Sequence, residues 1–435
     1  MKRPTTVLSL VALTAFVFMA GLFDHHQRSL VDWHSVRAVA IQSDDWGLCG
    51  FVPDDAALEG LDRTALGGTH FPPVYWRSTL EDSTDVADMT TLLLRHRGRD
   101  GLPAVFQPNM IMGFRDLDSD GHWTTGRIRE GWAQGYRRPG LWVAVREAIA
   151  AGVWAPELHG FLHYDPADRD ASILEGAPGV VEAARRGVLV FPGAHASFEL
   201  GPVLPTTDIA PLWRSMAADQ LAMFGRAPVS VVAPDYVWDD RHERMWADAG
   251  LRCVQAKRSQ RRKDLGGHEL WRRIRKYAER QWALWTVTDL TFLERNCRLE
   301  TAQAVDAAQE ARACGDQVLQ AWRGGRPAIV EAHRVNYIQT DDQAELLGRG
   351  YLDQLLTELD GQSPLYAADA ELAAWTRRGV SVDRRGGSWI VRNPGPAARL
   401  AVLPTPSPAT ILVPPHSALR IDISTRKMIE RITLH

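Results

Sequence analysis

The sequence predicts an α/β protein: a distorted barrel of seven or eight βα units, followed by a small all-β region. Between residues 36 and 359, short apolar runs alternate with amphipathic helical runs, as parallel βαβ units require. Polar residues with catalytic chemistry follow the ends of several apolar runs, where active residues of such barrels lie. From about residue 377, short β-type runs separated by Gly and Pro replace this alternation.

The first 24 residues predict a signal peptide or an N-terminal membrane anchor. Lys2 and Arg3 precede an uncharged, mostly apolar run from Val7 to Phe23. A helix of this length spans about 25 Å, slightly less than a hydrocarbon core of about 30 Å. We therefore expect an exported, extracytoplasmic protein, with a membrane as partner if the helix is retained.

The barrel is expected over residues 35–370. Its strands are predicted from apolar runs that end at polar or turn residues, at 36–42, 104–107, 156–158, 188–191, 229–233, 282–287 and 328–332. Its helices are predicted from amphipathic runs at 88–97, 141–151, 179–186, 209–224, 241–249, 301–322 and 342–359. A mixed segment at about residues 50–100 is expected to be an insertion.

Residues 377–435 are expected to form a β-sandwich-like appendage. The runs that predict its strands lie at 380–382, 388–392, 399–403, 410–413 and 419–423. Such a region would bind sugar or cover the barrel, and the sequence leaves both roles open.

Charge and cysteine content exclude some functions. The net charge is −3, from 50 basic and 53 acidic side chains, so the protein has no overall positive electrostatic potential that would attract nucleic acid. A basic run from Lys257 to Lys276 is either a solvated face or a contact for acidic glycans or lipid head groups. Four cysteines without a C-x-x-C motif do not predict a zinc or iron–sulfur site, although one or two disulfides remain open: Cys49, Cys253, Cys297 and Cys314. The oligomeric state is not predicted.

Three motifs could form a reaction centre. Asp44 and Asp45 end the first predicted strand, where one carboxylate could hold a metal while the other acts as a base. His159 and His163 are spaced i, i+4, which on a helical turn would let two imidazoles meet one metal ion. His333 ends a late strand and is expected on the same face of the barrel.

Together these motifs resemble the polysaccharide deacetylase superfamily (carbohydrate esterase family 4), over roughly residues 36–340. The resemblance implies a distorted β/α barrel with Asp45, His159 and His163 as metal ligands. It also implies Asp44 as general base and His333 as general acid. The segment from Val232 to Tyr236 looks like the family's Pro-Tyr element, whose Tyr236 N–H would bind the oxyanion.

The chain departs from the family pattern at several places. Trp46 separates the Asp pair from Gly47, and Asp235 splits the Pro-Tyr element. The Arg expected before that element is missing, and Arg334 follows His333 where an Asp is common. The distance of 114 residues from Asp45 to His159 is long and implies an insertion.

The expected function is hydrolysis of N- or O-acetyl groups on a polysaccharide or other glycan by metal-activated water. Two imidazoles and a carboxylate suit Zn²⁺ best, and Co²⁺ or Fe²⁺ would also fit. Four residues beside the motifs are expected to line the substrate groove: Asn109, Tyr164, Trp238 and Asn336. Two alternatives remain open, a non-catalytic glycan-binding or scaffold barrel, and another carbohydrate-active hydrolase such as a glycosidase with two carboxylates.

Overall fold

The structure is a computed structural model. It describes the chain apart from residues 1–13, 16, 24–29, 50, 65, 67–71, 118–121, 165, 167–169, 171–172, 174, 176–178, 191–208, 258–270, 272–273, 276, 279–287 and 435. The predicted strand at 282–287, most of the basic run and much of the leader therefore lie outside the described residues. Within the described part, no helix is long and apolar enough to span a membrane.

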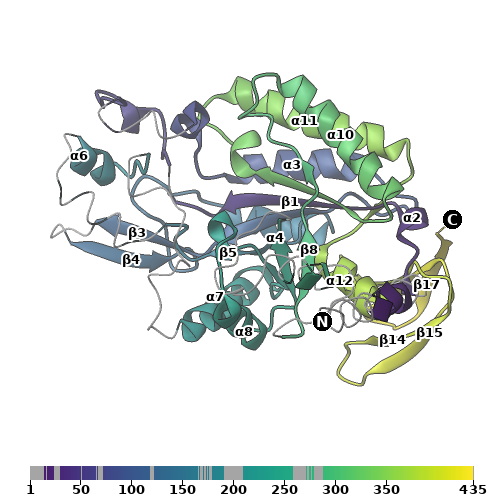
Figure 1. Ribbon diagram of the computed structural model, residues 1–435. Helices are drawn as coiled ribbons and strands as arrows, with labels where there is room; N and C mark the ends of the chain where they lie inside the picture. The colour runs from purple at the N-terminus through teal and green to yellow at the C-terminus, as the bar shows by residue number, and fades with distance from the viewer. Residues whose placement is uncertain are drawn as a thin grey trace, which may run out of the picture.

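A parallel sheet curls around the centre of the molecule (Figure 1). Its strands pair in the order β8-β7-β6-β5-β2-β1-β10-β9, and β11 pairs with the start of β1. The bounds are β1 Ala38–Trp46, β2 Phe106–Ile111, β5 Glu157–Gly160, β6 Ser230–Val231, β7 Cys253–Ala256, β8 Thr291–Glu294, β9 Cys297–Arg298, β10 Ala328–His333 and β11 Leu365–Tyr366. Every pair is parallel, so the carboxyl ends of the strands share one end of the sheet.

One segment joins the two ends of this sheet. β8 pairs with β7, β9 pairs with β10, and only Arg295 and Asn296 separate β8 from β9. The backbone N–H of Arg295 still donates to Ala256 on the β7 side, whereas that of Asn296 already donates to Ile329 on the β10 side. Main-chain hydrogen bonds therefore continue around the sheet, and the predicted distorted barrel is confirmed.

The longer helices cover the outside of the sheet, whereas the short α6 lies apart from it at the left of Figure 1. Their bounds are α2 Trp33–Val36, α3 Ser83–Arg95, α4 Leu141–Ala150, α6 Val180–Arg185, α7 Ala210–Phe224, α8 Asp240–Asp248, α10 Ala307–Arg323 and α11 Asp342–Asp360. Aspartate caps fix the N-termini of several, including Asp82, Asp239, Asp306 and Asp341. The helices bury one apolar face each, as α10 does with Cys314, Val318 and Trp322.

The inside of the barrel is layered. Ala38, Ala40 and Cys253 belong to an apolar cluster at the amino ends of the strands. One layer higher, Gln42 and Gln107 both donate to a carboxylate oxygen of Asp369, at 2.6 and 3.1 Å. Asp369 begins α12 (Asp369–Arg378), so this helix closes the amino end of the barrel and leaves the carboxyl end for the site.

An antiparallel all-β region follows α12, as predicted. Four strands pair in the order β12-β13-β16-β17, and β14 and β15 form a separate hairpin. Their bounds are β12 Ser381–Arg385, β13 Ser388–Asn393, β14 Arg399–Leu403, β15 Ala409–Val413, β16 Ser417–Asp422 and β17 Met428–Thr433. The region lies at the end of the barrel opposite the β3–β4 hairpin (Gly113–Leu117, Trp123–Arg127) (Figure 1).

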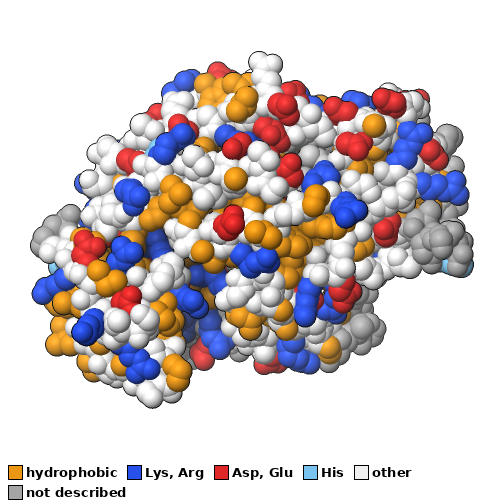
Figure 2. All heavy atoms as spheres, turned by 180° about the vertical axis from the view of Figure 1, so that it is seen from behind, with side chains coloured by type: hydrophobic (Ala, Val, Ile, Leu, Met, Phe, Trp, Pro, Cys, Tyr) orange, Lys and Arg blue, Asp and Glu red, His pale blue; other side chains and the backbone are white. Residues whose placement is uncertain are grey.

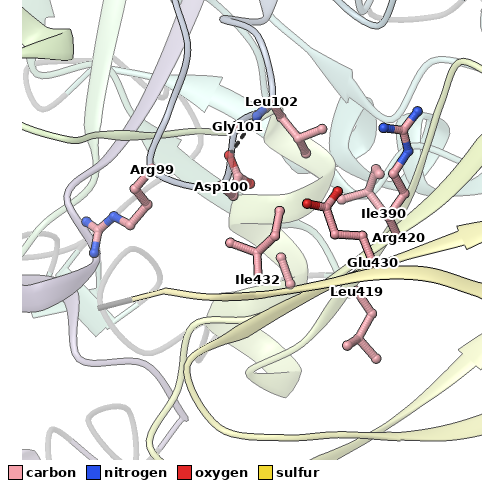
Figure 3. A pocket seen from close by; sticks show the side chains of 10 residues that line it. Arg99, Asp100, Gly101, Leu102, Ile390, Leu419, Arg420, Glu430 and Ile432 are labelled. Atoms are coloured by element: carbon pink, nitrogen blue, oxygen red, sulfur yellow. Dashed lines mark hydrogen bonds between the residues drawn. The ribbon is translucent and has the colours of Figure 1, made fainter.

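A cleft marks the seam between the barrel and this region. Figure 2 shows basic side chains gathered in the hollow there, and Figure 3 shows the lining residues. The loop of Arg99 and Leu102 forms one wall, and Leu419 and Ile432 belong to the other. The Arg99 guanidinium donates to the carbonyls of Ser35, Val36 and Ser363, so these hydrogen bonds stabilise the fold. The cleft lies beside the residues that precede β2, at the amino end of the barrel.

Some local predictions were wrong. Residues 188–190 form no strand, and the sequence did not indicate β7, β8, β9, β17 or the β3–β4 hairpin. These strands are short or carry polar residues, so their apolar signal is weak. The four cysteines are free and buried, so the disulfides that the sequence left open are absent from these positions.

Candidate metal centre

The Asp44–Asp45 pair lies within the last residues of β1, where the regular strand is interrupted. The pairing of β1 with β2 shifts register between Ser43 and Trp46. Asp45 has φ of +72°, in the left-handed region that non-Gly residues rarely adopt. This bulge allows both carboxylates to stay inside the protein, with Asp44 2% and Asp45 3% exposed.

The histidine pair comes from a strand and the loop after it. His159 is the third residue of β5, and the chain turns at Gly160 (φ +131°) and His163 (φ +68°). The expectation that i, i+4 spacing would place both rings on a helical turn was therefore wrong. The turn nevertheless brings the two ring centroids within 4.7 Å of each other.

Asp45, His159 and His163 converge. Asp45 Oδ1 lies 3.0 Å from His163 Nε2 and 3.5 Å from His159 Nε2. One ligand atom from each of the three lies within 4.8 Å of the others, and within the described part of the chain no other group of three or more acidic, His or Cys residues does this. The His159 Nδ1 lies 3.1 Å from the Val232 carbonyl, which orients the ring so that Nε2 faces the centre.

The donor set fits a divalent metal ion. Asp45 Oδ1 is buried and, among the described residues, accepts no hydrogen bond of ordinary geometry. Burial disfavours the charged carboxylate, but His163, His159 and His333 together outweigh burial, so the pKa of Asp45 is well below its usual range. A buried, ionised oxygen that faces two imidazole nitrogens is suited to share a cation with them.

Arg295 holds Asp44, and the sequence did not indicate it. Its Nη1 donates to Asp44 Oδ2 at 2.7 Å and its Nη2 to Asp44 Oδ1 at 2.6 Å. Asn109 Nδ2 donates to the same Oδ1 at 2.7 Å. Burial raises the pKa of Asp44, but Arg295, His159 and His333 together outweigh burial and lower it well below the usual value. Arg295 lies on the segment between β8 and β9.

His333 lies beside Asp44, as the sequence predicted. The two are register partners across β1 and β10, with Nε2 3.9 Å from Asp44 Oδ2. Its Nδ1 lies 2.6 Å from Glu300 Oε1. Burial lowers the pKa of His333, but Glu300, Asp45 and Asp44 together outweigh burial and raise it to about 10. Glu300 is thus the acidic partner of His333.

The predicted oxyanion role of the Tyr236 N–H needs correction. This N–H donates to the Ala233 carbonyl at 2.9 Å, within the 3₁₀ turn η3 (Pro234–Tyr236). Asp235 and Tyr236 both have positive φ, at 50° and 57°, because the inserted Asp235 changes the path of the turn. The Tyr236 hydroxyl instead accepts from Arg295 Nη1 at 2.7 Å.

The four residues expected in the substrate groove are buried in this structure, at most 3% exposed: Asn109, Tyr164, Trp238 and Asn336. Trp238 Nε1 donates to Glu243 at 3.0 Å. Asn336 Nδ2 donates to Glu300 at 3.0 Å and to the His333 carbonyl at 3.0 Å. Asn109 and Asn336 therefore support site residues, and contact of any of the four with substrate stays a prediction.

Two departures from the family pattern have structural roles. The Trp46 indole donates to Ser43 at 2.9 Å and packs edge-on against Trp154, so it anchors the end of β1 in the core. Arg334 is 0% exposed, pairs with Glu81 at 3.1 Å and donates to the Leu48 carbonyl.

Comparisons with known proteins give only distant similarities. No family model matches the chain, and no curated protein matches it. A solved structure of a proposed polysaccharide deacetylase from Mycobacterium smegmatis is 12% identical with a TM-score of 0.35, over 79% of this chain and 91% of that one. An alpha-amylase from Anoxybacillus is 10% identical (TM-score 0.31, 89% and 97% covered), and an endo-beta-1,4-mannanase double mutant from Cellulomonas fimi is 12% identical (TM-score 0.31, 92% and 94% covered). These TM-scores decide neither family nor activity.

Proposed function

We propose that this chain is a metal-dependent hydrolase that removes acetyl groups from a glycan. One observation carries the proposal: Asp45, His159 and His163 bring three ligand atoms within 4.8 Å of one another at the carboxyl end of a parallel barrel. This end of a βα barrel is where catalytic residues lie. Asp44 and His333, beside the triad, supply the two proton-transfer groups that hydrolysis needs.

Asp45 Oδ1, His159 Nε2 and His163 Nε2 would hold the ion, and Zn²⁺ is the first choice for this donor set. Bound there, a divalent cation would supply Lewis acidity and lower the pKa of a water molecule. Asp45 and His163 both have a left-handed backbone, and β1 is bulged between Ser43 and Trp46. These local conformations would hold the donors in place before the metal binds.

The neighbouring residues divide the proton transfers between them. Asp44 is ionised because Arg295 lowers its pKa, so it can accept a proton from the attacking water. His333 is protonated at neutral pH because Glu300 raises its pKa, so it can give a proton to the leaving nitrogen or oxygen. Water and an acetylated sugar would thus give acetate and a free amine or hydroxyl group.

Metal removal tests the proposal directly. We expect the purified protein to hold about one metal ion and to release acetate from tri-N-acetylchitotriose without creating new reducing ends. A chelator should abolish this release, and Zn²⁺, Co²⁺ or Fe²⁺ should restore it to different extents. New reducing ends would indicate a glycosidase, and binding of the oligosaccharide without any product would indicate the non-catalytic alternative.

Two variants separate metal binding from proton transfer. His163→Ala should lower metal content, because one of three donors is lost, whereas His34→Ala, at an exposed position, should retain it. Asp44→Asn should keep the metal but lose about 100-fold or more in kcat. Full metal content in His163→Ala, or full turnover in Asp44→Asn, would contradict these roles.

Export and membrane attachment stay part of the proposal. The apolar run from Val7 to Phe23 supports them. Fractionation of cells that express the full chain, with N-terminal sequencing of the product, would distinguish a cleaved leader from a retained anchor. Full-length protein in the cytosol would contradict export.

A further inference from the structure

A layer of buried amide side chains crosses the interior of the barrel between its amino end and Asp44. Its members Gln42 of β1, Gln107 of β2 and Gln255 of β7 are all 0% exposed, as is Asp369, the first residue of α12. Gln42 Nε2 donates to Asp369 Oδ1 at 2.6 Å, and Gln107 Nε2 donates to the same oxygen at 3.1 Å. Gln255 Nε2 donates to Asp369 Oδ2 at 2.9 Å. Both carboxylate oxygens of Asp369 therefore accept hydrogen bonds from this amide layer.

The opposite ends of two of these amides face Arg295. The Arg295 Nε donates to Gln42 Oε1 at 2.8 Å, and its Nη2 donates to Gln255 Oε1 at 2.5 Å. A side-chain amide has a donor end and an acceptor end, so each glutamine satisfies Asp369 and Arg295 together in only one orientation. Asp369 on one side and Arg295 on the other therefore require the same orientation of both amides.

These contacts also fix the orientation of Arg295. Its Nη1 donates to Asp44 Oδ2 and to the Tyr236 hydroxyl, both at 2.7 Å, and its Nη2 donates to Asp44 Oδ1 at 2.6 Å. Together with the two glutamine oxygens, five acceptors bind the five N–H donors of the planar guanidinium. The glutamine oxygens on one side of the guanidinium therefore help to set the position of the edge that binds Asp44.

A second connection between Asp369 and Asp44 passes through Asn109. The Asn109 Nδ2 donates to Asp44 Oδ1 at 2.7 Å and to Gln255 Oε1 at 2.9 Å. Its Oδ1 accepts from Gln255 Nε2 at 2.8 Å. Arg295 and Asn109, which both donate to Asp44, thus share Gln255 as a partner, and Gln255 is oriented by Asp369.

We propose that Asp369 is a positioning residue for the reaction: through Gln42 and Gln255 it orients Arg295, which holds Asp44, the proposed general base. The inference rests on the proposed function. A carboxylate suits this place because, when ionised, it only accepts hydrogen bonds, so each surrounding amide turns its nitrogen toward it. An asparagine at this position would direct an NH₂ group at a glutamine nitrogen. That glutamine would then have to turn its own NH₂ group toward Arg295.

Asp369→Asn tests this, because it keeps the size of the side chain and replaces one acceptor by a donor. With tri-N-acetylchitotriose as substrate, we expect kcat to fall on the order of 10-fold or more, because Asp44 is displaced, with KM and metal content near wild type. Glu371→Gln is the matched control, since Glu371 lies on the same helix, is 0% exposed and pairs with Arg392 at 2.9 Å. It should lower the melting temperature and leave kcat unchanged.

NMR of the Arg295 Nε–H measures the positioning without turnover. In ¹⁵N-labelled wild-type protein this proton should exchange slowly with water, since it is bonded to a buried glutamine, and its signal is assigned by its loss in Arg295→Lys. In Asp369→Asn the signal should shift, and the proton should exchange at least about 10-fold faster. In Glu371→Gln the signal should keep its wild-type position.

The effects on kcat should also be coupled. Because Asp369 acts through Arg295, adding Asp369→Asn to Arg295→Lys should lower kcat by much less than Asp369→Asn does alone. Wild-type kcat in Asp369→Asn, an unchanged Arg295 signal, or additive losses in the double variant would each overturn the inference.

A second variant covers the case in which Asp369→Asn does not fold. Gln42→Met interrupts the same connection and should lower kcat by a similar factor, because the Arg295 Nε loses its acceptor. Wild-type kcat in Gln42→Met would then overturn the inference. Wild-type protein that binds metal but releases no acetate would instead refute the proposed function, and the NMR measurement would still test how Asp369 positions Arg295.

Discussion

Residues in left-handed conformation gather at the candidate site. Asp45, His163, Asp235 and Tyr236 are four of the nine non-Gly residues with positive φ in the described chain. Each such residue costs on the order of 1 kcal/mol or more, and it persists where the surrounding structure holds it. Here the strain turns Asp45 and His163 toward each other and fixes the turn that carries Tyr236. The conformational cost is therefore offset by the rest of the fold, and it sets the geometry of the reaction centre.

Arg295 is the residue on which the charge of Asp44 most depends. It is 5% exposed, and its contacts to Asp44, Gln42 and Gln255 lie between 2.5 and 2.8 Å. We predict that Arg295→Met lowers the free energy of unfolding by about 3–5 kcal/mol, because the Asp44 carboxylate loses its cation in a buried place. Urea unfolding of the two proteins measures this.

Arg295→Lys keeps the charge but loses the planar pair of contacts, so the pKa of Asp44 should rise from its lowered value. Asp44 must be ionised to act as a base, and in this variant it protonates at a higher pH. The acid limb of kcat/KM against pH should therefore move to higher pH. An unmoved limb would show that Asp44 does not control activity.

At the scale of elements, single backbone contacts position the helices that support the site. Gly348 of α11 faces the Asn336 carbonyl so closely that an added Cβ would lie 1.6 Å from its oxygen. Asn336 in turn donates to Glu300 and to the His333 carbonyl. The approach of α11 to the turn after β10 thus sets the position of the proposed general acid.

We predict that Gly348→Ala lowers the free energy of unfolding by about 1–3 kcal/mol and lowers kcat, because α11 and the turn η4 (Arg334–Asn336) must separate. Gly350→Ala, two residues along the same helix, is the control. A Cβ there would contact nothing within 4 Å, so its higher helix propensity should stabilise the protein by about 0.5–1 kcal/mol. Equal effects of the two changes, measured by denaturant unfolding, would refute the close approach.

At the scale of the whole molecule, buried ion pairs join the barrel to the C-terminal β region. Arg392 of β13 pairs with Asp100 at 2.5 Å and with Glu371 of α12 at 2.9 Å. Arg226 and Asp383 form another such pair at 3.1 Å. Arg392, Asp100 and Glu371 are at most 1% exposed. Separation of the C-terminal β region from the barrel would therefore leave these charges without their partners.

We therefore predict that the barrel and the C-terminal β region unfold together. Arg392→Met should destabilise the protein by about 3–5 kcal/mol and keep a single transition in urea. Arg384→Met, at an exposed position of β12, should change stability by no more than about 0.5 kcal/mol. Two separate transitions, with an unchanged midpoint for the barrel, would show that the region is independent.

The sequence by itself determined the periodic and local features of this protein. The alternation of apolar and amphipathic runs predicted the barrel, because burial on both sides of parallel strands requires it. The change near residue 377 to short β-type runs separated by Gly and Pro predicted the antiparallel region. Asp44, Asp45, His159, His163 and His333 were indicated because they follow apolar runs, and the carboxyl ends of parallel strands share one end of a barrel.

Only the tertiary structure decided which side chains meet across long distances in the sequence. Arg295 lies 251 residues from Asp44, Glu300 lies 33 from His333, and neither belongs to a local motif. The turn that brings the two histidines together and the occupied N–H of Tyr236 likewise follow from the path of the chain in the closed barrel. A sequence pattern reports spacing along one element, whereas hydrogen bonds and charge act through space, so these partners become visible only once the chain has closed on itself.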